Sequence, residues 1–193
     1  MRDACDDIQL RHPGVEIVTV EYPWPIHDEQ QLVDMFIDPV EQLVQAGKTP
    51  RLAIVDAISS FATILFPFVT IVREMKKRGV EHVFVDGAHS LGQIDIDLEL
   101  IGADYYVGNC HKWLFGPKGT CLFYVAPQHQ QDLRPPIVSY NEGKRYPERY
   151  PDILAGKFVW LATRDPTSFS VLGESLKFIE NCGGLVCLIG CSC

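Results

Sequence analysis

The sequence predicts an α/β domain with a mostly parallel sheet flanked by helices. Three segments of buried-strand type, 51–56, 83–86 and 105–107, alternate with segments in which apolar residues recur at helical spacing. Each of these strands leads into polar residues, as expected where parallel strands end at one edge of a sheet. With 193 residues, of which 47% are hydrophobic, the chain is long enough for one such domain with a core.

The first half of the chain starts with a predicted strand at 15–20, where apolar and polar residues alternate. Helical spacing follows from 29 to 46, but Pro39 interrupts it. Because Asp38 and Pro39 have the form of an N-cap and a first-turn proline, two abutting helices are predicted there. The strand at 51–56 comes next.

The later elements are predicted from flanking glycines, prolines and apolar runs. They are a helix from Pro67 to Gly79, a strand ending at Asp86, a helical turn at 98–101, strands at 105–107 and 121–125, an irregular excursion from 127, regular structure at 158–161 and a helix from 165 to 179.

Composition excludes several classes of function. The net charge of −8 and the lack of a long basic run argue against nucleic-acid binding. No apolar run is long enough for a membrane span, and the acidic N-terminal residues do not form a signal peptide. Seven cysteines without a repeated spacing do not predict a disulfide framework, so a reduced, cytoplasmic location is expected.

The most informative segment is the turn Gly108-Asn109-Cys110-His111-Lys112-Trp113, which lies between two predicted strands. Burying a lysine ammonium is costly, so packing explains Lys112 poorly, whereas an amine nucleophile at a strand end explains it well. Upstream, an apolar strand ends in Asp86, and Gly87-Ala88-His89-Ser90 follows it. The order of the motifs places both at one edge of the sheet.

The pair of motifs, Val85-Asp86-Gly87-Ala88-His89-Ser90 and Asn109-Cys110-His111-Lys112-Trp113, resembles the class V aminotransferase family of pyridoxal-phosphate (PLP) enzymes. The resemblance is strongest to isopenicillin N epimerase-like and cysteine desulfhydrase-like members. It implies part of the large domain of a fold-type-I PLP-dependent transferase.

The resemblance also implies roles for the motif residues. Lys112 forms the Schiff base with PLP and moves a proton, and Asp86 pairs with the pyridine nitrogen of the ring. His89 matches the position that faces the phenolic oxygen of the cofactor. Asn109 and His111 match positions that hold its phosphate, with Asn109 where many relatives have serine.

A second segment, around Thr163, resembles the Gly-Thr-Arg-Asp sequence of the family. Its threonine reaches the phosphate of the partner subunit's cofactor, which implies a homodimer. Ala162 replaces the usual glycine here. Arg164 is a candidate for binding the substrate carboxylate, with an ion pair to Asp165 as the alternative.

Ser59 and Ser60 match a loop on the substrate side of the family's site. Close relatives often have a histidine in this loop where the present chain has Ala57. Together with Arg164, these serines are the predicted contacts of an amino-acid substrate.

The resemblance covers most of the chain but not a whole enzyme. Residues 1–181 are predicted to be a partial PLP-binding large domain. The family's N-terminal part, with a phosphate-binding helix N-terminus and a ring-stacking side chain, is expected to be missing, as is the small domain with its carboxylate-binding arginine. Residues 182–193 depart from the family and are interpreted as a truncated or mis-spliced end.

The predicted function is therefore that of a PLP-dependent enzyme domain acting on an amino acid, of cysteine desulfhydrase, epimerase or aminotransferase type. One alternative is a catalytically inactive fragment that keeps the fold and a dimer face. A second is a metal hydrolase using Asp86, His89 and His111. No His-x-x-x-His pair supports the second alternative, and no metal site is predicted.

Overall fold

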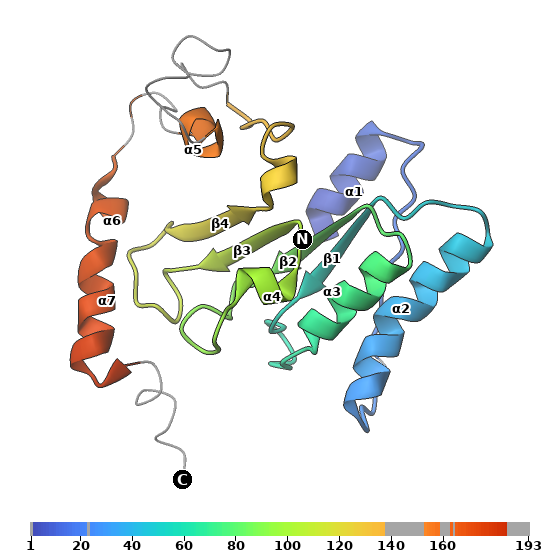
Figure 1. Ribbon diagram of the computed structural model, residues 1–193, viewed down its shortest axis with the longest axis horizontal. Helices are drawn as coiled ribbons and strands as arrows, with labels where there is room; N and C mark the ends of the chain where they lie inside the picture. The colour runs from blue at the N-terminus through green and yellow to red at the C-terminus, as the bar shows by residue number, and fades with distance from the viewer. Residues whose placement is uncertain (1, 23, 138–152, 159–162, 164, 185–193) are drawn as a thin grey trace.

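A four-stranded sheet forms the centre of the protein (Figure 1). The structure is a computed structural model that describes residues 2–22, 24–137, 153–158, 163 and 165–184. The strands β1 (Leu52–Asp56), β2 (His82–Asp86), β3 (Tyr105–Asn109) and β4 (Cys121–Val125) follow one another in space. The first three are parallel and β4 is antiparallel to β3. The predicted α/β class with a mostly parallel sheet is confirmed.

Two crossover helices cover one face of this sheet. Helix α3 (Phe68–Lys77) connects β1 to β2, and α4 (Leu98–Ile101) connects β2 to β3. Both lie in front of the strands in Figure 1. Because crossovers between parallel strands are right-handed, strands that follow in sequence order place their helices on the same face. Helix α2 (Glu29–Gln45) packs against α3.

The core lies between α3 and the strands. Its fully buried members include Ile71 of α3, Val55 of β1 and Val83 and Val85 of β2, each with no exposed surface. Burying one such side chain contributes about 1.5–3 kcal/mol to folding. The packing of this layer therefore holds β1 and β2 in position, and with them the residues at their carboxyl ends.

Helix α2 is continuous, so the prediction of two abutting helices is wrong. Pro39 lies inside it, and Asp28 caps its start by accepting a hydrogen bond from the Gln31 N–H at 2.9 Å. An interior proline costs about 3 kcal/mol. Five apolar side chains of one helix face are nevertheless buried against the core, and this burial outweighs the cost. They are Leu32, Val33, Phe36, Ile37 and Val40.

The strand predicted at 15–20 is also wrong, because the structure has no regular element there. Val15 and Val18 are 39% and 45% exposed. An alternating pattern forms a strand only when a neighbouring strand pairs with it, and none of the described strands does.

Further helices surround the sheet. They are α1 (Arg2–Arg11), the 3₁₀ helix η1 (Pro127–His129), α5 (Ile153–Phe158), α6 (Thr167–Ser170) and α7 (Leu172–Asn181). The predicted helix at 165–179 is present as α6 and α7, whereas α1 was not predicted, and α5 lies in the segment predicted to be irregular. The regular structure predicted at 158–161 lies, beyond Phe158, outside the described residues.

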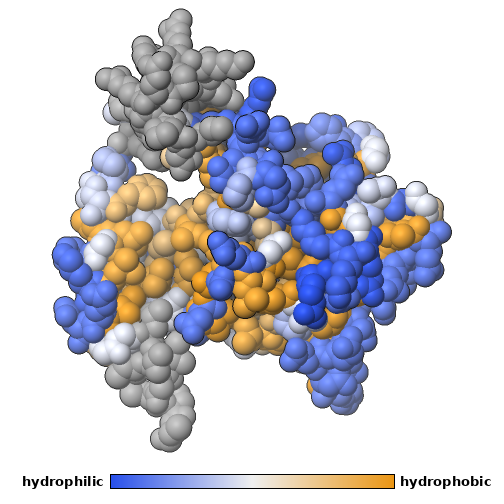
Figure 2. Space-filling view, viewed as in Figure 1, coloured by the Kyte–Doolittle hydropathy of each residue, from blue (hydrophilic) through white to orange (hydrophobic). Residues whose placement is uncertain are grey.

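Apolar side chains reach the surface in several places on the face shown in Figure 2, among them the region around α4 and the side of α6 and α7. Leu100 of α4 is 70% exposed, and Phe178 of α7 is 51% exposed. The outer surfaces of α2 and α3 are hydrophilic in the same view. Among the described helices, none has the length and apolar character needed to cross a membrane.

Candidate active site

The carboxyl ends of the parallel strands lie side by side, as predicted. Asp56, the last residue of β1, pairs in register with Asp86, the last residue of β2. Asp86 in turn lies opposite Val107 of β3, two residues before Asn109. The sheet thus places the two sequence motifs at one edge.

Lys112 lies in the connection between β3 and β4. The Cys110 N–H donates to the Thr120 carbonyl at 3.1 Å, and the Gly116 N–H donates to the Cys110 carbonyl at 2.9 Å. Thr120 is fully buried, and its hydroxyl donates to the Pro117 carbonyl at 2.7 Å. These bonds hold the backbone on both sides of the lysine.

The Lys112 amine contacts His89. The distance from Lys112 Nζ to His89 Nε2 is 3.0 Å, and both side chains are half-buried. Trp113 Nε1 donates to the other ring nitrogen, Nδ1, at 3.4 Å. An indole N–H only donates, so Nδ1 accepts and the hydrogen of the neutral imidazole lies on Nε2. The lysine amine and the imidazole thus lie within hydrogen-bond distance of each other at the sheet edge.

Burial lowers the pKa of His89 from its ordinary value, and the positive charge of Lys112 lowers it further, while Asp86 raises it in part. The imidazole is therefore neutral at neutral pH. A neutral ring has an unprotonated nitrogen, so its Nδ1 can accept the hydrogen bond from the Trp113 indole.

The loop that positions His89 packs closely on β3. The Ser90 hydroxyl donates to the Gly87 carbonyl at 2.7 Å and contacts the Tyr106 hydroxyl. A Cβ added to Gly87 would lie 2.4 Å from the Tyr106 ring, closer than real contacts allow. Glycine at this position therefore permits the approach that brings His89 to Lys112.

Asp86 makes the sheet edge acidic. Its carboxylate accepts a hydrogen bond from the Ala88 N–H at 3.0 Å. Burial, together with the negative charge of Asp86, raises the pKa of the neighbouring Asp56. A carboxylate in this place is suited to a cationic partner such as a protonated ring nitrogen.

Two further polar groups flank the lysine. His111 donates through Nδ1 to the Thr120 carbonyl at 3.0 Å, which leaves its Nε2 available for a ligand. Asn109 is half-buried, and its side-chain amide makes no hydrogen bond with the described part of the chain. The region around Lys112 thus offers an amine, a carboxylate, and two polar groups, the Asn109 amide and His111 Nε2, that have no hydrogen-bond partner in the described part of the chain.

Comparison with known proteins identifies the family. Residues 14–182 match the family described as Aminotransferase class-V. The chain belongs to this family. An L-cysteine desulfhydrase of Arabidopsis thaliana is 34% identical over 172 residues, which cover 89% of this chain and 36% of the relative. The isopenicillin N epimerase of Streptomyces clavuligerus is 32% identical over 144 residues, which cover 72% of this chain and 33% of the relative.

Solved structures show the same fold. The apo cysteine desulfurase from Thermococcus onnurineus NA1 has a TM-score of 0.68 at 16% sequence identity, and the match covers 93% of this chain and 42% of that one. The present chain spans about a third of the length of the curated relatives named above.

Among the described residues, no hydrogen bond joins the predicted substrate residues Ser59 and Ser60 to Lys112. Ser59 is buried, and its hydroxyl accepts a hydrogen bond from the Ile64 N–H at 3.1 Å within its own loop. Ser60 and Thr163 are exposed. Arg164 lies outside the described residues. The family roles of these four residues stay predictions.

Trp113 was not predicted as a site residue, although its indole N–H contacts His89. The available signal was its position directly after the lysine in a class V motif. As for the metal hydrolase, Asp86, His89 and His111 do not form a group within metal-ligand reach in the described part of the chain.

Proposed function

We propose that this chain is the central part of the large domain of a PLP-dependent class V enzyme that acts on an amino acid through Lys112. Its reaction is of cysteine desulfhydrase, epimerase or aminotransferase type, and these three share the proposed residues. The observation that carries the proposal is the 3.0 Å contact between Lys112 Nζ and His89 Nε2 at the sheet edge formed by Asp86. The relatives that bear the names of such enzymes support it.

The residues present fit the cofactor. Lys112 would hold PLP covalently through Nζ, and Asp86 would pair with its ring nitrogen. His89 would donate to the phenolic oxygen, while Asn109 and the free Nε2 of His111 would contact the phosphate. When bound, PLP supplies an electron sink for the carbanion that forms at the amino-acid α-carbon. The unpaired Asn109 amide and His111 Nε2 support this fit, because both offer hydrogen bonds that the described chain does not use.

Residues of this chain would then transfer or hold the protons that the reaction moves. Lys112, once its amine is free, acts as the base and acid at the substrate α-carbon. Trp113 fixes the tautomer of His89, so that Nε2 keeps a hydrogen to donate. The fully buried Thr120 holds the lysine turn, which limits the positions that Nζ can reach.

The proposal includes a homodimer in which Thr163 reaches the partner's cofactor, and a cytoplasmic location. Thr163 is exposed and therefore accessible to a second subunit. The four described cysteines, Cys5, Cys110, Cys121 and Cys182, are free thiols, which supports a reducing compartment.

The alternative is a catalytically inactive chain that keeps the fold and a dimer face. The inactive alternative is favoured by the positions of the arginines, because an enzyme usually binds a substrate carboxylate through an arginine side chain. Four of the described arginines form ion pairs with carboxylates of this chain. They are Arg11, Arg51, Arg73 and Arg78.

Reductive trapping tests the assignment of Lys112. The purified chain is incubated with PLP, reduced with borohydride and mapped by mass spectrometry after digestion. We expect the label on Lys112, and its loss in Lys112→Ala. Lys118→Ala is the matched control, since Lys118 is an exposed lysine in the same β3–β4 connection and its variant should label normally. A label on Lys118 or Lys48, with Lys112 unmodified, would contradict the assignment.

A further inference from the structure

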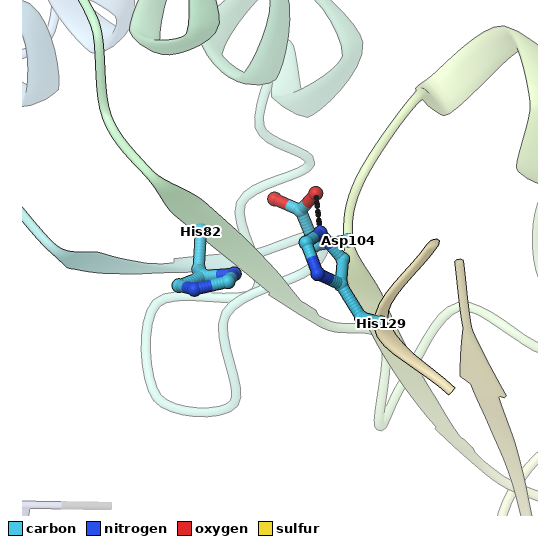
Figure 3. A group of neighbouring side chains, drawn as sticks. All are labelled: His82, Asp104 and His129. Carbon is cyan, nitrogen blue, oxygen red and sulfur yellow. Dashed lines mark hydrogen bonds and ion pairs between the residues drawn. The ribbon is translucent and has the colours of Figure 1, made fainter. Parts of the chain in front are cut away.

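A second cluster of side chains lies at the opposite edge of the sheet, where the strands begin. His82 starts β2, Asp104 directly precedes β3, and His129 ends η1 (Figure 3). One nitrogen or oxygen atom from each residue lies within 4.8 Å of the other two. In Figure 3 both rings are turned toward the space beside the Asp104 carboxylate. The proposed PLP site uses none of these residues.

Asp104 is an anchored carboxylate with one oxygen facing the cluster. It is 2% exposed. Its Oδ2 accepts a hydrogen bond from the Val83 N–H at 2.6 Å and forms an ion pair with Lys76. Its Oδ1 accepts from His129 Nε2 at 2.8 Å. Several donors around one carboxylate favour its ionised form.

His82 contributes a ring nitrogen that lacks a hydrogen-bond partner. Its Nδ1 is buried and has no hydrogen-bond partner among the described residues. Its ring lies 4.7 Å from the His129 ring, centroid to centroid, at an interplanar angle of 67°. Buried polar atoms are almost always satisfied, so an unpaired nitrogen in a ring that lies beside a histidine and a carboxylate indicates a ligand.

We propose that His82 Nδ1, Asp104 Oδ1 and His129 Nε2 bind a divalent transition metal ion, Zn²⁺. Two imidazole nitrogens and one carboxylate oxygen suit this ion, and a water molecule completes four-coordination.

Metal binding follows a simple exchange at His129. Its Nε2 now donates a hydrogen to Asp104; when the metal binds, the neutral ring carries its hydrogen on Nδ1 instead, exchanged through water, so that the lone pair of Nε2 is free for the ion. The bond between His129 and Asp104 is replaced by two bonds to the ion. Lys76 remains on Oδ2 and does not compete for Oδ1. The ion would tie η1, and with it the end of β4, to the starts of β2 and β3.

Titration of the whole 193-residue chain tests the site. The protein is stripped with a chelator, its thiols are alkylated so that cysteines do not bind metal, and ZnCl₂ is added in a calorimeter. We expect one ion per chain and a higher unfolding temperature with zinc. His82→Gln and His129→Gln should each weaken binding at least about tenfold, since even groups that only orient metal ligands are worth that much.

His12→Gln is the matched control, because His12 is an exposed histidine outside the cluster. It should bind zinc as the parent chain does. With Co²⁺ as the probe, the parent should show the intense visible absorption of a four-coordinate ion, and both cluster variants should lose it. The absence of saturable binding by the parent, or equal affinity in His82→Gln and the parent, would overturn the proposal.

Discussion

His89 links the charge of the Lys112 turn to the stability of the fold. Burial, and then the positive charge of Lys112, lower its pKa below the ordinary value of 6.5. Between the lowered pKa and that value, the unfolded chain binds more protons at this residue than the folded chain. Its contribution to stability is therefore present above about pH 6.5 and is lost as the pH falls through the folded pKa.

The corresponding prediction concerns His89→Gln. The free energy of unfolding, measured by urea denaturation from pH 8 to pH 5, should fall less steeply in this variant than in the parent. His27→Gln, at an exposed position, should keep the parental slope. Identical slopes for His89→Gln and the parent would show that His89 does not titrate as described.

Asp86 gives a second prediction at the scale of single residues. In a full-length class V relative, Asn at the position that matches Asp86 should reduce turnover by about a hundredfold, because the ring nitrogen loses its charged partner. Cofactor attachment should remain, since Lys112 is unchanged. Turnover and PLP absorbance are measured on the same preparations. Near-normal turnover with PLP bound would remove Asp86 from the proposed role.

Individual residues also show which parts of the candidate site a sequence motif can predict. The motifs indicated Asp86, His89 and Lys112, and the structure brings His89 and Lys112 into contact. The inward bond of the Ser59 hydroxyl was not predictable, because it depends on the fold of its own loop. The contact of Asp104 with His129 spans 25 residues and no motif marks it.

Among the secondary-structure elements, local signals predicted the four strands of the sheet and α3 well, but they also predicted a strand at 15–20 that is absent and divided α2 in two. The apolar runs of β1, β2, β3 and β4 determined those strands. Pro39 was given too much weight, because the buried face of α2 outweighs one unfavourable residue. Helix α1 was missed since its sequence is polar and lacks an apolar stripe; its Arg11–Asp7 ion pair joins exposed side chains.

The packing of the two loops at the candidate site rests on Gly92, which gives a prediction at this scale. Gly92 has φ +88°, and an added Cβ would lie 2.4 Å from the Trp113 carbonyl oxygen. Gly92→Ala should therefore cost about 1–2 kcal/mol for the left-handed backbone and about 1–3 kcal/mol more for the clash.

Gly79→Ala is the matched control, because Gly79 has φ +83° with nothing within 4 Å of an added Cβ. It should show only the backbone cost. Urea unfolding of both variants gives the difference. Equal destabilisation would mean that the His89 loop and the Lys112 turn do not pack as closely as described.

In the whole molecule, two groups of functional side chains lie at opposite ends of the strands of one sheet. The carboxyl edge holds Asp86, His89 and Lys112, and the amino edge holds the His82–Asp104–His129 cluster. Strand polarity makes this separation, since residues before and after the same strands lie on opposite sides of the core. The parallel sheet was predictable from sequence, and so was the position of the motif residues, whereas the amino-edge cluster depends on tertiary packing.

The last prediction concerns catalysis by the 193-residue chain expressed by itself. We expect its cysteine desulfhydrase and aminotransferase turnover with added PLP to be far below that of a full-length relative. Four of the described arginines, Arg11, Arg51, Arg73 and Arg78, already pair with carboxylates, and Ser59 uses its hydroxyl within its own loop. These five described residues are therefore not free to bind the substrate carboxylate.

One missing orienting or electrostatic group commonly costs about a hundredfold in rate, and several losses compound without being strictly additive. The measurement compares initial rates of the purified chain and of the Arabidopsis thaliana L-cysteine desulfhydrase, of which the matched region covers 36%. The borohydride label at Lys112 is recorded in parallel, so that absent turnover is distinguished from absent cofactor. Turnover within about tenfold of the relative would show that residues of this chain suffice for substrate binding and chemistry.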